Sequence, residues 1–322
     1  MNNPTYSSVL NESFLERFSR TISDRPYDFL PALSSDLVAE HFKNYLSNIR
    51  HTKHTRITCL QDDEKIHGIA IVHELPWDSS QLGISTGKLD FFTINTESMC
   101  TTSLNSTLLA RTLEEARQIG IRFLWCKCPQ DDIAQAHALE EAGFRFMDHE
   151  LILAFPGTPT NRSHHKNEAW PIEVIRQREM PQLAPIGNLF SKSRFHADPK
   201  IGHVKADQLW RESVLGAVAG HATEVFVAFD ENKPIGMISC RDDSLSDDGP
   251  RHPVRSLFHV GVIESHQGKG VSHDLLTEVL ATATQFDATY VETQSTNIAA
   301  LALYQAHGFK IVGGRYSFHR HF

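Results

Sequence analysis

The 322-residue sequence lacks several features that would each point to a particular class of protein. No apolar run approaches the roughly 20 residues that a membrane-spanning helix needs. No cluster of lysine and arginine resembles a surface for the phosphate backbone, and the formal net charge of −8 disfavours nucleic-acid binding. The N-terminus has no basic segment followed by an apolar one, as a secretion signal would have. We therefore expect a cytoplasmic protein without a nucleic-acid or membrane partner.

Cysteine is also scarce, with five scattered residues: Cys59, Cys100, Cys126, Cys128 and Cys240. Cys126 and Cys128 form the only close pair, and a strand would point both side chains to the same face. Zinc would need two further ligands at suitable spacing, and the sequence does not offer them. Buried structural thiols are the favoured interpretation, and no metal site is expected.

What the final third does contain is a glycine turn between an apolar run and an amphipathic segment. Residues 257–272 read LFHVGVIESHQGKGVS. Glycines allow backbone N–H groups to turn toward an anion at a helix N-terminus, where the peptide dipoles also favour negative charge. The pattern indicates a pyrophosphate-binding turn, without the spacing of a Walker lysine or of a G-x-G-x-x-G dinucleotide turn. Alone, such a turn is weak evidence, because some turns of this kind are plain connectors without a ligand.

A second pattern follows and gives the turn more meaning. Asn297 and Tyr304 lie seven residues apart on a predicted helix, so two helical turns place them on one face. Gly308 is positioned to end that helix. Together, Q-x-x-G-x-S followed by N-x-x-A-x-x-x-Y-x-x-x-G-F resembles motifs A and B of the GNAT acyl-CoA N-acyltransferases. One departure is Ser272, where the family has Gly or Ala, and serine is still small enough for the pyrophosphate to fit.

The chain repeats itself at an offset of 165 residues, which aligns Gly143 with Gly308. Both copies read as strand, short loop, helix, Gly-Phe and strand. The first copy has Asp132 in place of Asn297 and Leu139 in place of Tyr304, and residues 101–106 (TTSLNS) stand where the glycine turn would be.

These differences predict two domains and a linker. We expect residues 1–156 to form a degenerate GNAT-like domain without chemistry of its own, residues 157–169 to form a linker, and residues 170–322 to form the catalytic GNAT domain. In the second half, strand patterns cover residues 172–175, 224–229, 234–240 and 254–263, and helical patterns cover residues 181–193 and 205–219. The expected fold class is α/β (α+β), with tandem GNAT-like mixed sheets flanked by helices and a degenerate N-terminal copy.

The resemblance implies that acetyl-CoA is the co-substrate and that certain residues hold it. Pantetheine would pair with the backbone of Val260 and Val262, in the gap where their strand splays from its neighbour, and the Val262 amide would serve as oxyanion donor. The pyrophosphate would bind the backbone of the turn: Gln267, Gly268, Lys269, Gly270, Val271 and Ser272. Asn297 would contact the pantetheine arm. Tyr304 would protonate the departing thiolate as general acid, the alternative being a tyrosine that merely packs on the sheet.

The general base is less well defined. His259 and Glu264 flank the coenzyme strand, and Glu292 lies on the next one. For each of the three, a structural role is favoured over a catalytic one, and the amine can instead lose its proton to water.

The acceptor is suggested by a further resemblance. Residues 190–201 (FSKSRFHADPKI) and 206–216 (ADQLWRESVLG) resemble the acceptor-side helices of the dTDP-fucosamine acetyltransferase family. Residues 75–83 (LPWDSSQLG) are similar to that family's W-D-S-x-x-F-G segment, with Leu82 in place of phenylalanine. The resemblance implies a dTDP-linked 4-amino sugar as the acceptor, with Arg194 and Asp198 nearest to it. Alternatively, residues 193–195 simply join two helices and Arg194 pairs with a carboxylate.

The leading hypothesis is an N-acetyltransferase that acts on a nucleotide-linked amino sugar by direct transfer in a ternary complex. A peptide N-terminus, an antibiotic or another small amine is the alternative acceptor. A non-catalytic acyl-CoA sensor is a third reading, which the presence of both Asn297 and Tyr304 disfavours. A homodimer is one possible assembly.

Overall fold

The computed structural model describes residues 5–7, 12–22, 24–49, 51–93, 100–155, 170–245 and 251–322, with the side chains of residues 5–7 and 100–103 left out. The predicted linker, residues 157–169, lies outside the described residues. The chain divides into two compact units. The first unit comprises Met1–Phe29, Leu33–His149 and Gly313–Phe322, and the second comprises Leu30–Ala32 and Glu150–Val312.

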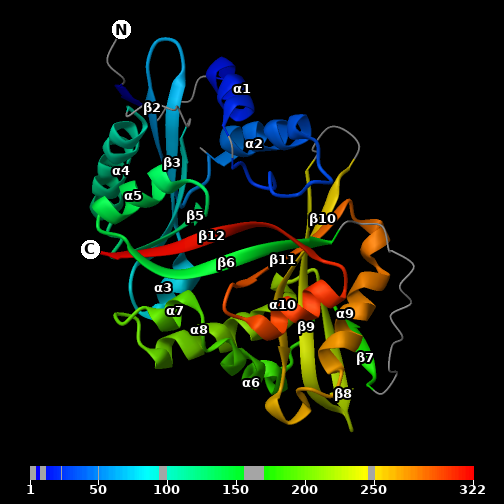
Figure 1. The fold of residues 1–322 in the computed structure, drawn as a ribbon. Coiled ribbons are helices and arrows are strands. Elements are labelled where there is room, and N and C mark those ends of the chain that lie inside the picture. Colours follow the sequence, from blue (N-terminus) through cyan, green and yellow to red (C-terminus); the bar gives the residue numbers. More distant parts are fainter. Residues whose placement is uncertain are drawn as a thin grey trace. The chain divides into compact units, whose positions relative to one another are not determined.

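The first unit is a mixed sheet with helices on both faces (Figure 1). Its strand order is β1-β2-β3-β4-β5-β12, in which only β4 and β5 run parallel. The strands are β1 (Thr5–Ser7), β2 (Thr55–Gln61), β3 (Ile66–Glu74), β4 (Thr86–Thr93), β5 (Phe123–Pro129) and β12 (Lys310–His321). The helices are α1 (Glu12–Thr21), α2 (Ser35–Ile49), α3 (Pro76–Leu82), α4 (Cys100–Gln118) and α5 (Ile133–Glu141).

Alternation along β3 explains these layers. Ile69 and Ile71 join a buried cluster with α1 and α2, whereas Ala70 and Val72 join one with α4 and α5. Successive strand residues point to opposite faces, so an uninterrupted apolar run buries both faces of the sheet.

The second unit has the same plan, with strand order β6-β11-β10-β9-β8-β7 and one parallel pair, β10 with β11. The strands are β6 (Arg145–Phe155), β7 (Ile172–Ile175), β8 (Glu224–Asp230), β9 (Lys233–Ser244), β10 (Pro253–Val262) and β11 (Ala288–Gln294). The helices are α6 (Ala184–Gly187), α7 (Arg194–Ala197), α8 (His203–Gly216), α9 (Val271–Ala281) and α10 (Ile298–Ala306). One buried cluster packs the sheet against α9 and α10, and another packs it against α6 and α8. The predicted mixed sheets flanked by helices, one in each unit, are confirmed.

The helical pattern predicted over residues 181–193 forms short pieces instead of one helix. A 3₁₀ turn at Pro181–Leu183 leads into α6, and a second 3₁₀ turn follows at Asn188–Phe190. Pro185 supplies no N–H donor. Gly187 crosses α8 so closely that an added Cβ would lie 2.6 Å from the Arg211 backbone. The break therefore follows from proline geometry and from this close helix crossing.

The repeat seen in the sequence has a clear structural basis at both ends of α5 and α10. Asp132 and Asn297 are the N-caps, and each side chain accepts a hydrogen bond from the backbone three residues later. Gly143 and Gly308 follow the helix ends with φ of 81° and 92°, a left-handed conformation that glycine adopts without strain. The correspondence of Asp132 with Asn297 thus reflects helix capping.

The last strand of each half belongs to the unit of the other half. In the first unit, β5 pairs with Arg315–His321 of β12, although β12 follows α10 in the chain. In the second unit, β11 pairs with Glu150–Phe155 of β6, although β6 follows α5. The predicted boundaries at residues 156 and 170 take no account of this strand exchange.

Candidate active site

The coenzyme strand predicted from the sequence diverges from its neighbour at the expected place. The parallel ladder between β10 and β11 runs from Val254 with Ala288 to Leu257 with Val291, where the described pairing ends. On its other side, β10 stays paired with β9 as far as Val262, with a bulge between Leu257 and His259. A bulge bends its strand and increases the local twist, so it accounts for the divergence of β10 from β11.

Backbone alternation fixes which main-chain groups face the resulting gap. The N–H of Ile263 donates to Ile235 at 2.9 Å, on the β9 side. Because the N–H and C=O of alternate strand residues point to alternate sides, those of Val262 and Val260 point toward β11. This is the direction that their predicted pairing with pantetheine requires. The Val262 carbonyl also accepts a bond of 2.9 Å from the Gln267 side chain, which the sequence did not suggest.

The glycine turn lies between the end of β10 and the start of α9. Gly268 and Gly270 have φ of 72° and 87°. An added Cβ on Gly268 would meet nothing within 4 Å, so backbone conformation, and not space, selects glycine there. Gln267, Gly268 and Lys269 are exposed, and the N–H groups of the first helical turn have no partner within the helix. The predicted anion-binding turn is therefore open at a helix N-terminus.

Asn297 and Tyr304 occupy opposite ends of α10 and differ in burial. The Asn297 side chain accepts from Ala300 N and donates to Thr293 Oγ1, both at 3.3 Å, so it already has a capping role. Tyr304 is 2% exposed, and its ring centroid lies 5.7 Å from that of Phe309. Burial raises the pKa of the Tyr304 phenol, so the hydroxyl is protonated at neutral pH and can act as an acid but not as a base. Their roles toward the coenzyme stay predictions.

In the first unit the corresponding strands, β4 and β5, also diverge, but a side chain occupies the gap between them. The ladder between β4 and β5 ends at Leu89, as that of β10 ends at Leu257. Beyond it, the buried side-chain amide of Gln135 donates to the Phe91 carbonyl at 3.3 Å. When β4 is compared with β10 through their pairing with β3 and β9, Phe91 and Val260 stand at equivalent positions beyond the end of the parallel ladder. The residue of the second half that corresponds to Gln135 is Ala300.

Two further differences distinguish the first unit from the second. Residues 101–106 lie inside α4, so a helical turn replaces the glycine turn. In addition, α5 packs along α4, whereas α10 meets α9 chiefly through His307, whose ring centroid lies 4.6 Å from that of His273. The first half thus differs from the second in structure as well as in its motif residues, and its lack of chemistry stays a prediction.

The histidine weighed as a base is held in the interior. His259 is 1% exposed, and its ring nitrogens lie 3.0 Å from the hydroxyls of Ser213 and Ser239. Burial, and to a lesser extent Arg241, lowers the pKa of His259 to about 3. Both ring nitrogens are already engaged, so a structural role is favoured, and the link to Ser213 fastens α8 to β10. Of the other two candidates, Glu264 is exposed and Glu292 is half-buried.

The segment predicted to face the acceptor is fixed by a partly buried polar network. Ser193 Oγ lies 2.8 Å from His196 Nδ1 and accepts from Trp210 Nε1 at 2.8 Å, and His196 Nε2 lies 3.0 Å from an Asp207 oxygen. Arg194, which is half-buried, sits beside this network with its guanidinium 4.5 Å from the Phe195 ring.

Asp198 is buried, and its Oδ1 accepts from the Lys200 backbone at 2.9 Å. Its carboxylate therefore stabilises a turn. Contact of Arg194 and Asp198 with a sugar nucleotide stays a prediction.

Comparison with known proteins agrees with this geometry. Residues 186–309 match the model of the acetyltransferase (GNAT) family. The match spans α7, α8, the diverging strand β10, the glycine turn and α10.

Relatives of known name or structure extend the likeness to both halves. The spore coat polysaccharide biosynthesis protein SpsD of Bacillus subtilis (strain 168) is 22% identical over 265 residues, covering 81% of this chain and 86% of SpsD. A GCN5-related N-acetyltransferase from Sphaerobacter thermophilus superposes with a TM-score of 0.64 at 12% identity, covering 100% of this chain and 96% of that one. A tandem GNAT protein of the clavulanic acid pathway gives 0.58 at 11% identity, covering 99% and 98%. The two structures establish the tandem fold.

Other expectations concern cysteine, metal and membrane. Cys59, Cys126, Cys128 and Cys240 are buried free thiols, as predicted. Within the described ranges, no group of three or more His, Cys, Asp or Glu side chains is arranged to hold a metal ion. No helix in the described part of the chain is both long and apolar enough to cross a bilayer.

Proposed function

We propose that this protein is an acetyl-CoA-dependent N-acetyltransferase whose coenzyme site lies in the second unit. The observation that carries the proposal is the divergence of β10 from β11 directly before the glycine turn. It exposes a row of backbone groups that ends at the N-terminus of α9, so an extended arm bearing a pyrophosphate could pair with the strand and end at the helix.

In this proposal each residue has one task. The backbone of Val260 and Val262 orients the thioester, and the Val262 N–H stabilises the negative charge that develops on the carbonyl oxygen as the amine attacks. The residues from Gln267 to Ser272 hold the pyrophosphate, and Asn297 contacts the pantetheine arm. As the carbon–sulfur bond breaks, Tyr304 donates its proton to the thiolate, and the new amide loses its extra proton to water.

For the acceptor we propose a nucleotide-linked amino sugar. The relative SpsD is named for polysaccharide biosynthesis. In addition, the acceptor-side segment, residues 190–216, carries five basic residues against three acidic ones (Asp198, Asp207 and Glu212) in a chain whose net charge is −8: Lys192, Arg194, Lys200, Lys205 and Arg211. Local positive charge would be needed to bind a nucleoside diphosphate to an acidic protein. Arg194 is the best candidate, because its planar fork can bind phosphate through two parallel hydrogen bonds. We place the reaction in the cytoplasm, where acetyl-CoA is available.

Release of free thiol from acetyl-CoA tests both the proposed acetyltransferase activity and the proposed acceptor. We expect turnover with a dTDP-linked 4-amino-4,6-dideoxyhexose, and much less with a peptide or an aminoglycoside. Turnover of a simple amine alone would refute the acceptor and keep the acetyltransferase. Absence of turnover with every amine, together with tight binding of acetyl-CoA, would indicate a sensor instead. The Gly270→Val variant is the control for release that does not depend on the coenzyme site.

A further inference from the structure

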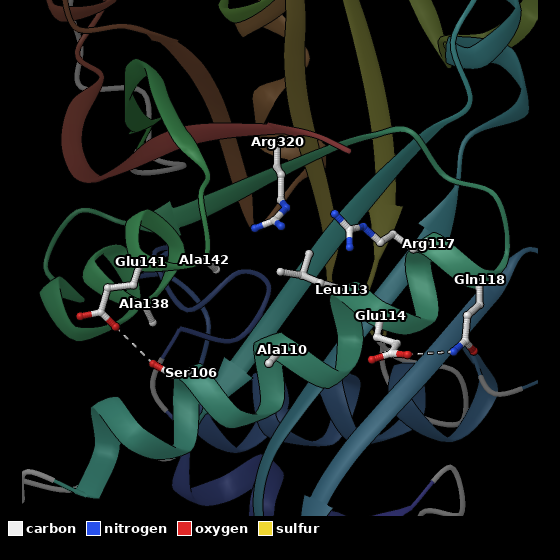
Figure 2. Close-up of a pocket in the computed structure, with 10 residues that line it drawn as sticks. All are labelled: Ser106, Ala110, Leu113, Glu114, Arg117, Gln118, Ala138, Glu141, Ala142 and Arg320. Atoms are coloured by element: carbon white, nitrogen blue, oxygen red, sulfur yellow. Dashed lines mark hydrogen bonds between the residues drawn. The ribbon is translucent and has the colours of Figure 1, made fainter.

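A cavity of about 670 Å³ opens in the first unit, whereas the proposed coenzyme site belongs to the second. It lies between α4, α5 and the end of β12 (Figure 2). Its walls combine apolar side chains with polar and charged ones, among them Ser106, Leu113, Arg117, Gln118, Glu141 and Arg320. The volume is in the range of small-molecule sites.

Two arginines converge on this cavity from different elements. Arg117 lies in the last turn of α4 and Arg320 lies on β12, and Figure 2 shows both guanidinium groups pointing into the space next to Leu113. The carbon atoms of the two guanidinium groups lie 5.3 Å and 5.2 Å from the centroid of the same ring, that of Phe322. Both guanidinium groups therefore border the same ring, and their charges repel each other.

Among the described residues, neither arginine has a carboxylate within 4.0 Å. The two glutamates of the cavity bond to neutral groups instead: Gln118 donates to Glu114 at 3.3 Å, and Ser106 donates to Glu141 at 3.4 Å. The Nε of Arg320 is buried and has no hydrogen-bond partner in the described part of the chain. Burial, and then repulsion from Arg117, lowers the pKa of Arg320. Arg117 and Arg320 therefore line the cavity together with Glu114 and Glu141, and among these described side chains no ion pair joins an arginine to a glutamate.

A cation at a helix C-terminus has a structural explanation, because it complements the helix dipole. That explanation applies to Arg117 but not to Arg320, which comes from a strand. An arginine buried for structural reasons normally has a hydrogen-bonded partner, as Arg255 of the second unit has in Asp242 and Glu224. Arg320 is half-buried and its Nε has no such partner in the described part of the chain, so a bound anion can supply one.

We propose that Arg117 and Arg320 bind the phosphate group of a small molecule whose remainder occupies the cavity. Two guanidinium forks offer more donors than a carboxylate can accept, and their double charge matches a phosphate dianion. Ser106 and Gln118 can contact the polar part of the molecule, and Leu113 its apolar part. A whole coenzyme A is not the ligand, since α4 replaces the glycine turn there.

Inorganic phosphate is the probe for this site, with the full-length chain carrying Gly270→Val so that the turn of the second unit is weakened. Equilibrium dialysis with labelled phosphate should show saturable binding, which Arg117→Gln and Arg320→Gln each weaken by about 10-fold or more. Arg111→Gln is the matched control, because Arg111 lies on α4 and pairs with Glu115 at 2.9 Å. Equal phosphate binding by both cavity variants and the control would overturn the proposal.

Two further measurements keep the test decisive. If Arg320→Gln does not fold, Arg320→Lys keeps the charge but loses the fork, and it should still bind phosphate more weakly than the Gly270→Val parent; unchanged binding would overturn the assignment of Arg320. Displacement of phosphate by acetate as readily as by sulfate would overturn the choice of phosphate over carboxylate. None of these measurements uses acetyl-CoA, so their failure leaves the proposed acetyltransferase untouched.

Discussion

Replacing Ala300 with glutamine would place in the second unit the side chain that fills the gap in the first. Gln135 and Ala300 both occupy the third position of a helix that begins after a capping residue. The Gln135 amide reaches the Phe91 carbonyl, and Val260 is the counterpart of Phe91. In Ala300→Gln, we therefore expect the new amide to bond to the Val260 carbonyl and to occupy the space intended for pantetheine.

The magnitude follows from the contacts involved. The coenzyme would lose at least one backbone hydrogen bond and would have to displace a bonded side chain, together about 1.5–3 kcal/mol. The dissociation constant for acetyl-CoA should then rise by about 10- to 100-fold. Isothermal titration measures it directly, with Ala302→Gln as the matched control, because Ala302 lies on the exposed side of the same helix.

Equal coenzyme affinity of Ala300→Gln and Ala302→Gln would refute the reasoning. It would mean that the glutamine turns back to cap its own helix, as Gln often does at this position, or that pantetheine does not bind at Val260. The converse change, Gln135→Ala, leaves a buried carbonyl without its donor. It should lower the free energy of unfolding by about 1–3 kcal/mol without creating a second coenzyme site, because the glycine turn is still missing.

Four other variants test single residues. Gly270→Val forces a branched side chain into a left-handed conformation and should weaken acetyl-CoA binding by about 10-fold in titration calorimetry; unchanged affinity would exclude the turn from the site. Tyr304→Phe should lower kcat by about 10²–10³ with little effect on KM, and an unchanged kcat would mean that the thiolate receives its proton elsewhere. Arg194→Ala should raise KM for the sugar nucleotide by about 10-fold and spare that for acetyl-CoA; a loss of folding would instead identify a structural arginine. His259 is neutral when folded down to about pH 3, whereas an unfolded histidine takes up a proton near pH 6.5. Its contribution to stability is therefore complete above about pH 6.5 and is lost as the pH falls toward 3, and His259→Asn should show a shallower fall of the unfolding free energy over that window in urea titrations.

The local features of the second unit could be predicted from the sequence. Strands over residues 172–175, 224–229 and 254–263, the positive φ of the glycine turn and the helix end at Gly308 all depend on residues next to each other in the chain. The direction of the Val260 and Val262 backbone also follows from strand alternation once the glycine turn fixes where the strand ends.

Features that depend on a distant partner could not be predicted. The pattern of a strand identifies its buried face but not its neighbour, so the pairing of β12 with β5 left no signal in the sequence. A buried glutamine in a helix reads as an ordinary helix former until its acceptor, Phe91, is known. Asn297 likewise combines a motif position with a capping role, and the sequence does not separate the two.

The exchange of last strands has a consequence for how the chain is made. Ribosomes synthesise proteins from the N-terminus, and a domain usually folds once its own residues have emerged. Here the sheet of the first unit stays incomplete until Gly313–Phe322 has been translated. Its pairing of β5 with β12 closes a chain separation of nearly 200 residues, which slows folding. Removal of β12 should therefore destabilise the first half of the protein more than the second half, although β12 belongs to the second half of the sequence. Neither half should fold when it is synthesised alone.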